Sequence, residues 1–224
     1  MNSFRRTATI VLFILPSLLI AQSKVGDFYR FKDSSIHIEG IAPGIISGTF
    51  YFSGVNTGEL YELRDAAIRK FPIPSYWPRW SMLGMKTDTI HQLLFISRSA
   101  LPQSPDTIDS YHASDVIVFD LRANAFTKRF PMGDHNGLVL FNDIAITPDG
   151  RVLVSDGGRP GGVYALNVDE GNFRSLNTKG IKSPQGIVAL DTVIYIASYT
   201  EGLFRYSIAR DTSVFVDVTN LSDE

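Results

Sequence analysis

Four side chains of this sequence stand at one place in a phrase that the chain repeats: Glu39, Leu83, Asn142 and Gln185. Three of the four carry oxygen donors, namely one carboxylate and two carboxamides. An oxygen-only set suits Ca²⁺ or Mg²⁺ and does not suit zinc, which prefers nitrogen and sulfur ligands. A cation held by them would polarise an ester carbonyl and lower the pKa of a bound water. This chemistry requires a fold that brings residues far apart in the sequence together.

The repeat that carries these residues predicts such a fold. Each of the four precedes a Gly or an Asp, and short hydrophobic β-runs follow. The Gly or Asp positions are Gly40, Gly84, Asp143 and Gly186, with spacings of 44, 59 and 43 residues. A period in the forties with several strands in each unit is typical of β-propeller blades. Because radial repetition places equivalent positions at one end of a central channel, we expect Glu39, Asn142 and Gln185 to converge.

We therefore expect an all-β fold, a β-propeller of four-stranded blades with about four blades present. The blade-like units cover residues 37–72, 82–131, 141–176 and 184–218. A six-bladed ring needs roughly 260–300 residues, so the chain is either a closed ring of four blades or a fragment of a six-bladed ring. We expect the fragment, with a propeller domain over 24–224 that is incomplete at its C-terminus. A strand expected over 27–31 could complete another blade.

The N-terminus has the pattern of a signal peptide over residues 1–23. Arg5 and Arg6 supply the positive region, residues 8–20 are apolar, and Ala21 and Ser23 are the small residues of a cleavage site. The apolar run is shorter than the roughly 20 residues of a membrane span, and an uncleaved anchor is the alternative. The pattern predicts a periplasmic or secreted protein with no membrane association after cleavage.

Composition excludes several classes of function. The 224 residues are 44% hydrophobic and 20% charged, which is enough for a packed core in one large domain. A net charge of −2 and the lack of a basic stripe argue against nucleic-acid binding. The chain has no Cys, so disulfides and a Cys nucleophile are excluded. The sequence shows no recognisable Ser-His-Asp motif.

The phrases beginning at Glu39 and at Asn142 resemble those of the regucalcin/gluconolactonase family of β-propellers, over about residues 37–208. The resemblance implies a metal-dependent hydrolase of a sugar lactone or related ester. Members hold one divalent cation, usually Ca²⁺, through a Glu, two Asn and an Asp. Glu39 and Asn142 match the Glu and the first Asn, and Gln185 stands at the second Asn. The family's Asp, which is also its acid/base, would lie beyond Glu224, so the catalytic residue is unknown.

Gln185 leaves two interpretations of these residues open. The longer side chain keeps the carbonyl oxygen but moves it by about 1.5 Å, the length of one carbon–carbon bond. The set is then either a cation site of Glu39, Asn142 and Gln185, or a group of rim residues that bond one another and channel water. The corresponding functions are a lactone hydrolase and a non-catalytic propeller that binds a small ligand or a protein partner.

Other residues that could take part in chemistry also have structural interpretations. Asp143 is expected to cap a turn or to pair with a basic residue. His37 is expected to be a hydrogen-bonded structural residue. Trp77 and Trp80 form either a sugar-stacking lid or a packed connection between blades. The polar, Pro-containing insertion over 100–112 is either a functional loop or a tolerated surface insertion.

Overall fold

The computed structural model describes residues 33–106, 112–133, 137–178 and 180–216, which lie within one compact unit of the chain, 33–224. These residues form strands and turns and contain no helix, hence no helix long and apolar enough to cross a membrane. The expected signal peptide over 1–23 and the expected strand over 27–31 lie outside the described residues.

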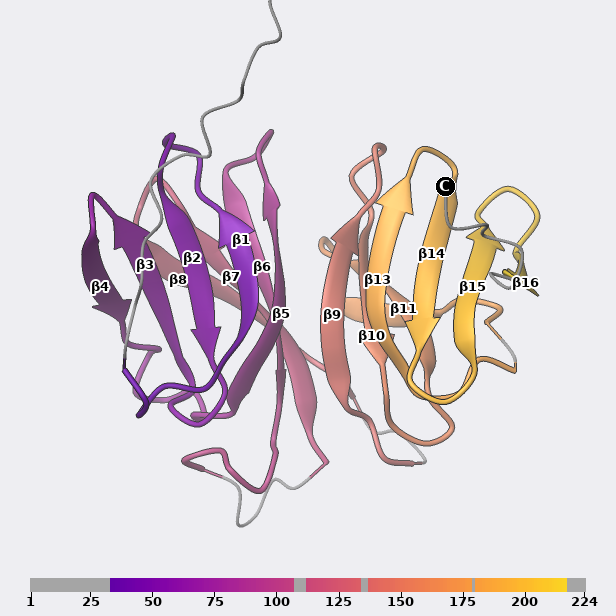
Figure 1. The fold of residues 1–224 in the computed structure, drawn as a ribbon, viewed down its shortest axis with the longest axis horizontal. Helices are drawn as coiled ribbons and strands as arrows, with labels where there is room; N and C mark the ends of the chain where they lie inside the picture. Colours follow the sequence, from indigo (N-terminus) through magenta and orange to yellow (C-terminus); the bar gives the residue numbers. More distant parts are fainter. Residues whose placement is uncertain (1–32, 107–111, 134–136, 179, 217–224) are drawn as a thin grey trace, which may run out of the picture. The chain divides into compact units, whose positions relative to one another are not determined.

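The strands form four antiparallel sheets of four strands, each paired in sequence order (Figure 1). Blade 1 contains β1 (Ile38–Pro43), β2 (Phe50–Gly54), β3 (Glu59–Arg64) and β4 (Ala67–Phe71). Blade 2 contains β5 (Ser81–Asp88), β6 (Leu93–Ser99), β7 (Ser114–Asp120) and β8 (Ala125–Pro131). Blade 3 contains β9 (Phe141–Ile146), β10 (Val152–Asp156), β11 (Gly162–Asn167) and β12 (Asn172–Ser175). Blade 4 contains β13 (Pro184–Leu190), β14 (Val193–Ser198), β15 (Gly202–Ser207) and β16 (Thr212–Phe215).

The expected all-β fold and its four blade-like units are confirmed. Each sheet lies inside one of the four predicted ranges to within one residue at either end. The outer strand of blade 3, β12, was not predicted, because its four residues are polar apart from Phe173 and mostly exposed. Outer strands carry the weakest hydrophobic alternation because solvent reaches them on both sides.

Three apolar clusters lie between consecutive blades and form the core. Successive strand residues point to opposite faces, so each blade gives alternate side chains to its two neighbours. Tyr51 and Phe119 pack between blades 1 and 2, Phe95 and Phe141 between blades 2 and 3, and Ile194 between blades 3 and 4.

The outward faces of the first and last described blades are apolar and open. Ile41 of β1 is 67% exposed, whereas its equivalents Met85 and Ile144 are 5% and 2% exposed beneath the preceding blade. On the other side, Val188 of β13 is 43% exposed, whereas its equivalent Ala145 is 2% exposed beneath blade 4.

A β-bulge interrupts the innermost strand of every blade at the repeated phrase. In blade 3, Phe141 pairs with Asp156 and Ile144 with Val154, so Asn142 and Asp143 together oppose the single residue Ser155. The same register shift occurs in the other three blades. The pairs that form the bulges are Glu39 and Gly40, Leu83 and Gly84, Asn142 and Asp143, and Gln185 and Gly186. A bulge bends the strand and redirects a side chain, which is the local device that the site requires.

Two of the bulge glycines are required by close approach of neighbouring inner strands. A Cβ on Gly40 would collide with the Leu83 carbonyl oxygen of blade 2. A Cβ on Gly84 would lie 2.5 Å from the Asp143 Cα of blade 3. Any larger residue at either position would therefore push two blades apart.

A buried serine opposite the bulge joins one blade to the next. Ser97 Oγ donates to the Asn142 carbonyl oxygen at 2.5 Å. Ser155 Oγ accepts from the Asp143 N–H at 2.9 Å and donates to the Gln185 carbonyl oxygen at 2.6 Å. Both serines are fully buried, so these hydroxyls satisfy backbone groups that water does not reach. We call these contacts the serine seam.

We expect Ser155→Ala to lower the free energy of unfolding by about 1–3 kcal/mol, because it leaves buried backbone groups of two blades without a partner. Urea unfolding followed by tryptophan fluorescence measures the loss. The matched control is Ser175→Ala on β12, where the side chain is exposed, and its effect should stay within about 0.5 kcal/mol. Equal effects of the two variants would show that the seam does not hold the blades together.

Candidate functional site

The structure brings the three predicted oxygen-bearing residues into one pocket. Glu39 of β1, Asn142 of β9 and Gln185 of β13 line a cavity of about 280 Å³ together with the bulge residues Gly84 and Asp143. The expected convergence of equivalent blade positions is therefore present in the geometry. Leu83, which lacks a polar group, is 2% exposed and is not part of this lining. We call this cavity the central pocket.

The two amide side chains are held by their nitrogen ends. Asn142 Nδ2 donates to the Pro184 carbonyl oxygen at 3.3 Å, and Gln185 Nε2 donates to Ser183 Oγ at 3.2 Å. Both nitrogens lie against Gly157, where any Cβ would collide with them. Because a backbone carbonyl cannot donate, the bond to Pro184 fixes which end of Asn142 is the nitrogen. In the part of the chain described here, no hydrogen bond occupies the two amide oxygens, so they remain available to accept a hydrogen bond or to coordinate a cation.

Glu39 supplies an unpaired carboxylate at the mouth of the pocket. Its side chain is exposed, and among the described residues it has no hydrogen bond or ion pair. Although solvent reaches the residue, neighbouring atoms partly desolvate its carboxyl, and this desolvation, followed by repulsion from Asp143, raises the pKa of the Glu39 carboxyl above its ordinary value. Solvent screens this repulsion, so its effect on stability is small. A cation bound nearby would relieve the repulsion.

Asp143 is held by the backbone of two blades. Its Oδ1 accepts from its neighbour Ile144 N–H at 2.8 Å, and its Oδ2 accepts from the Ile187 N–H of blade 4 at 3.1 Å. Burial raises the pKa of the Asp143 carboxyl, while these two N–H groups and the charge of Lys86 act in the opposite direction. Asp143 therefore caps backbone groups across a blade boundary and forms no ion pair within the described part of the chain.

The residues present fit a hard cation weakly. Within the described ranges, no group of three or more His, Cys, Asp or Glu side chains is placed to hold a metal ion. The donors in the central pocket are instead one free carboxylate and two amide oxygens, a set suited to Ca²⁺ and unsuited to zinc. Affinity for Ca²⁺ depends on the number of charged ligands, and Glu39 is the only unengaged carboxylate in the described lining.

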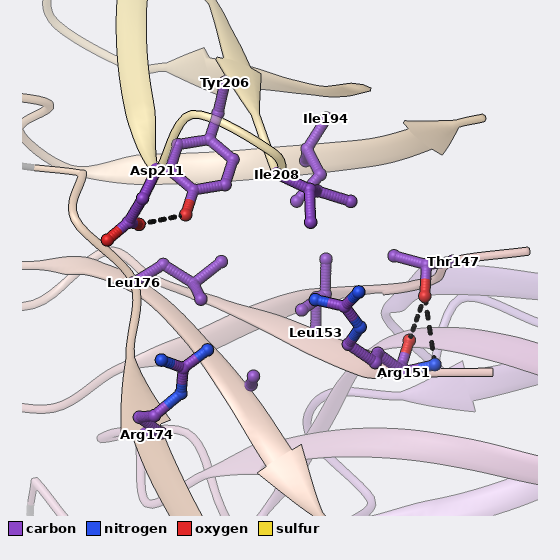
Figure 2. Close-up of a pocket in the computed structure, with 10 residues that line it drawn as sticks. Thr147, Arg151, Leu153, Arg174, Leu176, Ile194, Tyr206, Ile208 and Asp211 are labelled. Carbon is purple, nitrogen blue, oxygen red and sulfur yellow. Dashed lines mark hydrogen bonds between the residues drawn. The ribbon is translucent and has the colours of Figure 1, made fainter. Parts of the chain in front are cut away.

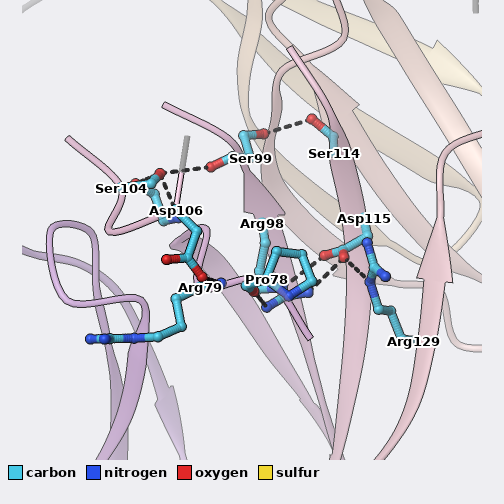
Figure 3. Close-up of polar contacts among 10 residues, drawn as sticks. Pro78, Arg79, Arg98, Ser99, Ser104, Asp106, Ser114, Asp115 and Arg129 are labelled. Carbon is cyan, nitrogen blue, oxygen red and sulfur yellow. Dashed lines mark hydrogen bonds and ion pairs between the residues drawn. The ribbon is translucent and has the colours of Figure 1, made fainter. Parts of the chain in front are cut away.

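The aromatic residues before β5 pack against a buried ion pair. Figure 3 shows the polar contacts of this ion pair. Arg98 donates through two nitrogens to Asp115 at 2.8 and 2.6 Å, and both side chains are fully buried. Arg129 donates to the same carboxylate at 2.6 Å, and its guanidinium lies over Trp80 at 5.1 Å from the ring centroid. Arg98 also donates to the Pro78 carbonyl oxygen at 2.8 Å. These contacts make Trp80, which is 5% exposed, part of a packed connection and not an open lid.

The described part of the 100–112 insertion is hydrogen-bonded to the segment that leads from blade 1 into β5 and to the start of β5. Ser104 Oγ accepts from the Ser81 N–H at 2.9 Å, and Asp106 accepts from the Arg79 N–H at 2.9 Å. Residues 107–111 lie outside the described residues. Because β6 ends beside the start of β5, the insertion leaves the blade at the end that carries the central pocket.

The remaining candidates lie around the pocket and not in it. His37 is exposed before β1, and its N–H donates to Asn56 at 2.9 Å. Tyr199 follows β14 at the end of the blade that carries the pocket, and it is 83% exposed. Sequence reasoning missed the roles of Ser183 and Gly157, because a hydroxyl and a missing side chain that orient amides give no pattern in a single sequence.

In buffer free of divalent cations, we expect Glu39→Gln to be more stable than the wild type at pH 7. A carboxyl whose pKa is raised by folding stabilises the fold below its unfolded-state pKa of about 4.3, and this contribution is lost as the pH rises through the folded-state pKa. The advantage of Glu39→Gln should therefore shrink as the pH falls toward about 4. Thermal midpoints at several pH values measure this, with the exposed Glu170→Gln as control. A wild type more stable than Glu39→Gln at pH 7 would contradict the electrostatics described here.

Comparison with known proteins identifies the fold alone. No protein-family model matches the chain, and no curated protein matches it. A chain in the crystal structure of the nidogen/laminin complex is similar with a TM-score of 0.59 and 17% identity, over 80% of this chain and 62% of that chain. A chain in the structure of U3-55K is similar with a TM-score of 0.63 and 9% identity, over 82% of this chain and 52% of that chain. The chain thus spans less than two thirds of either neighbour, and the similarity establishes a β-propeller-like fold, whereas membership of the regucalcin/gluconolactonase family remains a prediction.

Proposed function

We propose that the central pocket binds a divalent cation, Ca²⁺ above all, through Glu39, Asn142 and Gln185. We further propose that the bound cation receives a sugar lactone or related ester for hydrolysis. The observation that supports this best is the orientation of the two amides, whose nitrogens are bonded to the protein. Their oxygens and the Glu39 carboxylate have no hydrogen bond among the described residues, and the three residues line one cavity contributed by three blades.

The donor set supports a weak cation site of the kind found outside the cytoplasm. One carboxylate with amide oxygens and water corresponds to the range of about 10⁻⁴ to 10⁻³ M that extracellular calcium modules show. The proposal therefore includes export, for which the N-terminal sequence pattern is the support.

The reaction requires an electrophile and a proton acceptor. A bound cation supplies Lewis-acid polarisation of the ester carbonyl. Glu39 holds the cation by its charge, and the cavity of about 280 Å³ suits a small cyclic ester. Asp143 is the other ionisable side chain in the described lining, and burial raises its pKa in the direction that favours proton uptake. The proposal gives Asp143 that role, since each carboxylate oxygen keeps a lone pair beyond its backbone bond.

A second candidate function is non-catalytic binding of a protein partner by the same end of the blades. Tyr76 and Tyr199 are 81% and 83% exposed there, and large exposed aromatics are typical of recognition surfaces. The similar chain of the nidogen/laminin complex comes from a protein–protein complex.

Calcium titration of the purified chain tests the proposal. We expect a dissociation constant of about 10⁻⁴ to 10⁻³ M by isothermal titration calorimetry, and at least tenfold weaker binding for Glu39→Gln, because this change removes the one unengaged carboxylate of the described lining. Glu170→Gln, a charge-matched change on an exposed turn outside the pocket, should bind as the wild type does. Calcium-dependent hydrolysis of gluconolactone, measured as acid release, should disappear in EDTA and in Glu39→Gln.

The possible results separate the two candidates. Absence of calcium binding in the wild type would refute the cation site. Calcium binding without hydrolysis of any lactone tested would refute the hydrolase and leave the binding propeller.

A further inference from the structure

A second pocket lies between blades 3 and 4 (Figure 2). It lies at the end of the blades opposite to the central pocket. It encloses about 160 Å³, and its lining includes the apolar residues Leu153, Ile194 and Ile208 and two arginines, Arg151 and Arg174. Thr147 at the end of β9 contributes to the lining, which places the pocket far along the blade from the bulge. We call it the inter-blade pocket.

Two residues of blade 3 beside this space are smaller than their counterparts in blade 1: Ala165 replaces a glutamate and Leu153 replaces a tyrosine. Leu153, Ala165 and Arg174 stand opposite one another on three neighbouring strands of blade 3 and form one row across it. The equivalent row of blade 1, counted from the seam serine, is Tyr51, Glu62 and Arg69. Ala165 thus stands where blade 1 has the acid Glu62.

The cavities beside the two rows of residues differ in volume. The space beside Glu62 and Arg69, between blades 1 and 2, encloses about 90 Å³, against about 160 Å³ beside Ala165 and Arg174. Blade 3 therefore keeps the arginine of the row and lacks both the volume and the negative charge of the glutamate.

The positively charged guanidinium groups of Arg151 and Arg174 line the inter-blade pocket. In the part of the chain described here, Arg174 forms no ion pair, whereas Arg151 is bonded to Asp149 through Nε at 2.8 Å and Nη2 at 2.6 Å. Figure 2 shows both guanidinium groups directed toward the middle of the pocket. The one carboxylate of the lining, Asp211, already accepts from the Tyr206 hydroxyl and from the Asn177 N–H.

Both arginines lower the pKa of the Tyr206 hydroxyl. Burial and the bond to Asp211 raise the pKa of Tyr206 to about 12, while Arg174 and Arg151 act against this rise. The lining therefore combines apolar side chains with two arginines, of which Arg151 is already paired with Asp149 and Arg174 has no ion pair among the described residues.

We propose that the inter-blade pocket binds a small monocarboxylate with a compact apolar body, such as an aromatic carboxylate. The carboxylate lies on the guanidinium of Arg174, in the place that Glu62 takes in blade 1, and the body lies on Leu153, Ile194 and Ile208. The volume is sufficient, because a dry cavity of about 150 Å³ lined by Leu, Ile and Phe in another protein holds benzene. Arginine is the side chain best suited to hold a carboxylate through paired hydrogen bonds.

Benzoate tests this proposal directly. We expect saturable binding to the full chain with a dissociation constant of about 1 mM by NMR titration, with shifts of the Ile194 and Ile208 methyl signals. Benzyl alcohol, which has the same ring and no charge, should bind at least tenfold more weakly. Arg174→Gln should weaken benzoate binding about tenfold, whereas Arg205→Gln, an exposed arginine of β15 outside the pocket, should leave it unchanged.

A second variant introduces into blade 3 a glutamate at the position that corresponds to Glu62 of blade 1. Ala165→Glu places the residue of blade 1 in the pocket of blade 3, so it should abolish benzoate binding and raise the thermal midpoint. Glu39→Gln should not affect benzoate binding, which keeps this proposal separate from the cation site. No saturable binding at millimolar benzoate, equal binding of benzyl alcohol, or equal effects of Arg174→Gln and Arg205→Gln would each overturn it.

Discussion

The close approach of the inner strands at their bulges is the constraint on which the rest of this structure depends. Gly40 and Gly84 have no side chain because the neighbouring blade occupies the place of a Cβ. Ser97 and Ser155 then bond the carbonyl oxygens of the next inner strand. Those carbonyls belong to Asn142 and Gln185, the residues whose side chains line the central pocket. Packing of the blades and presentation of the site are therefore consequences of one local arrangement.

The repeat made most of the fold predictable. A two-residue side-chain period and a recurring phrase are local properties, so the blades follow from the sequence, and the convergence of Glu39, Asn142 and Gln185 follows from radial repetition. The strand β12 was missed because a short outer strand has little hydrophobic alternation. The orientation of the two amides was not predictable, since it depends on the Pro184 carbonyl oxygen and on Ser183, which are recognisable as partners only in three dimensions.

The two proposed sites use the same blade framework at opposite ends. At one end the first residue of the bulge differs between blades, and its side chain decides whether an oxygen ligand lines the central pocket. At the other end a residue of the third strand differs, as Glu62 and Ala165 do, and decides how much space lies between two blades. Such substitutions leave strand pairing intact, because alternate side chains of a strand change without changing its backbone hydrogen bonds.

Paramagnetic relaxation by Mn²⁺ tests most directly whether the bulges direct their side chains toward one bound cation. Mn²⁺ prefers the same oxygen ligands and broadens the signals of nearby amides. At substoichiometric Mn²⁺, the amide signals of Gly40, Gly84 and Gly186 should broaden first in the wild type and remain sharp in Glu39→Gln. The signal of Gly150, in a turn at the other end of blade 3, should not change. Broadening centred elsewhere, or equal broadening in Glu39→Gln, would contradict the account.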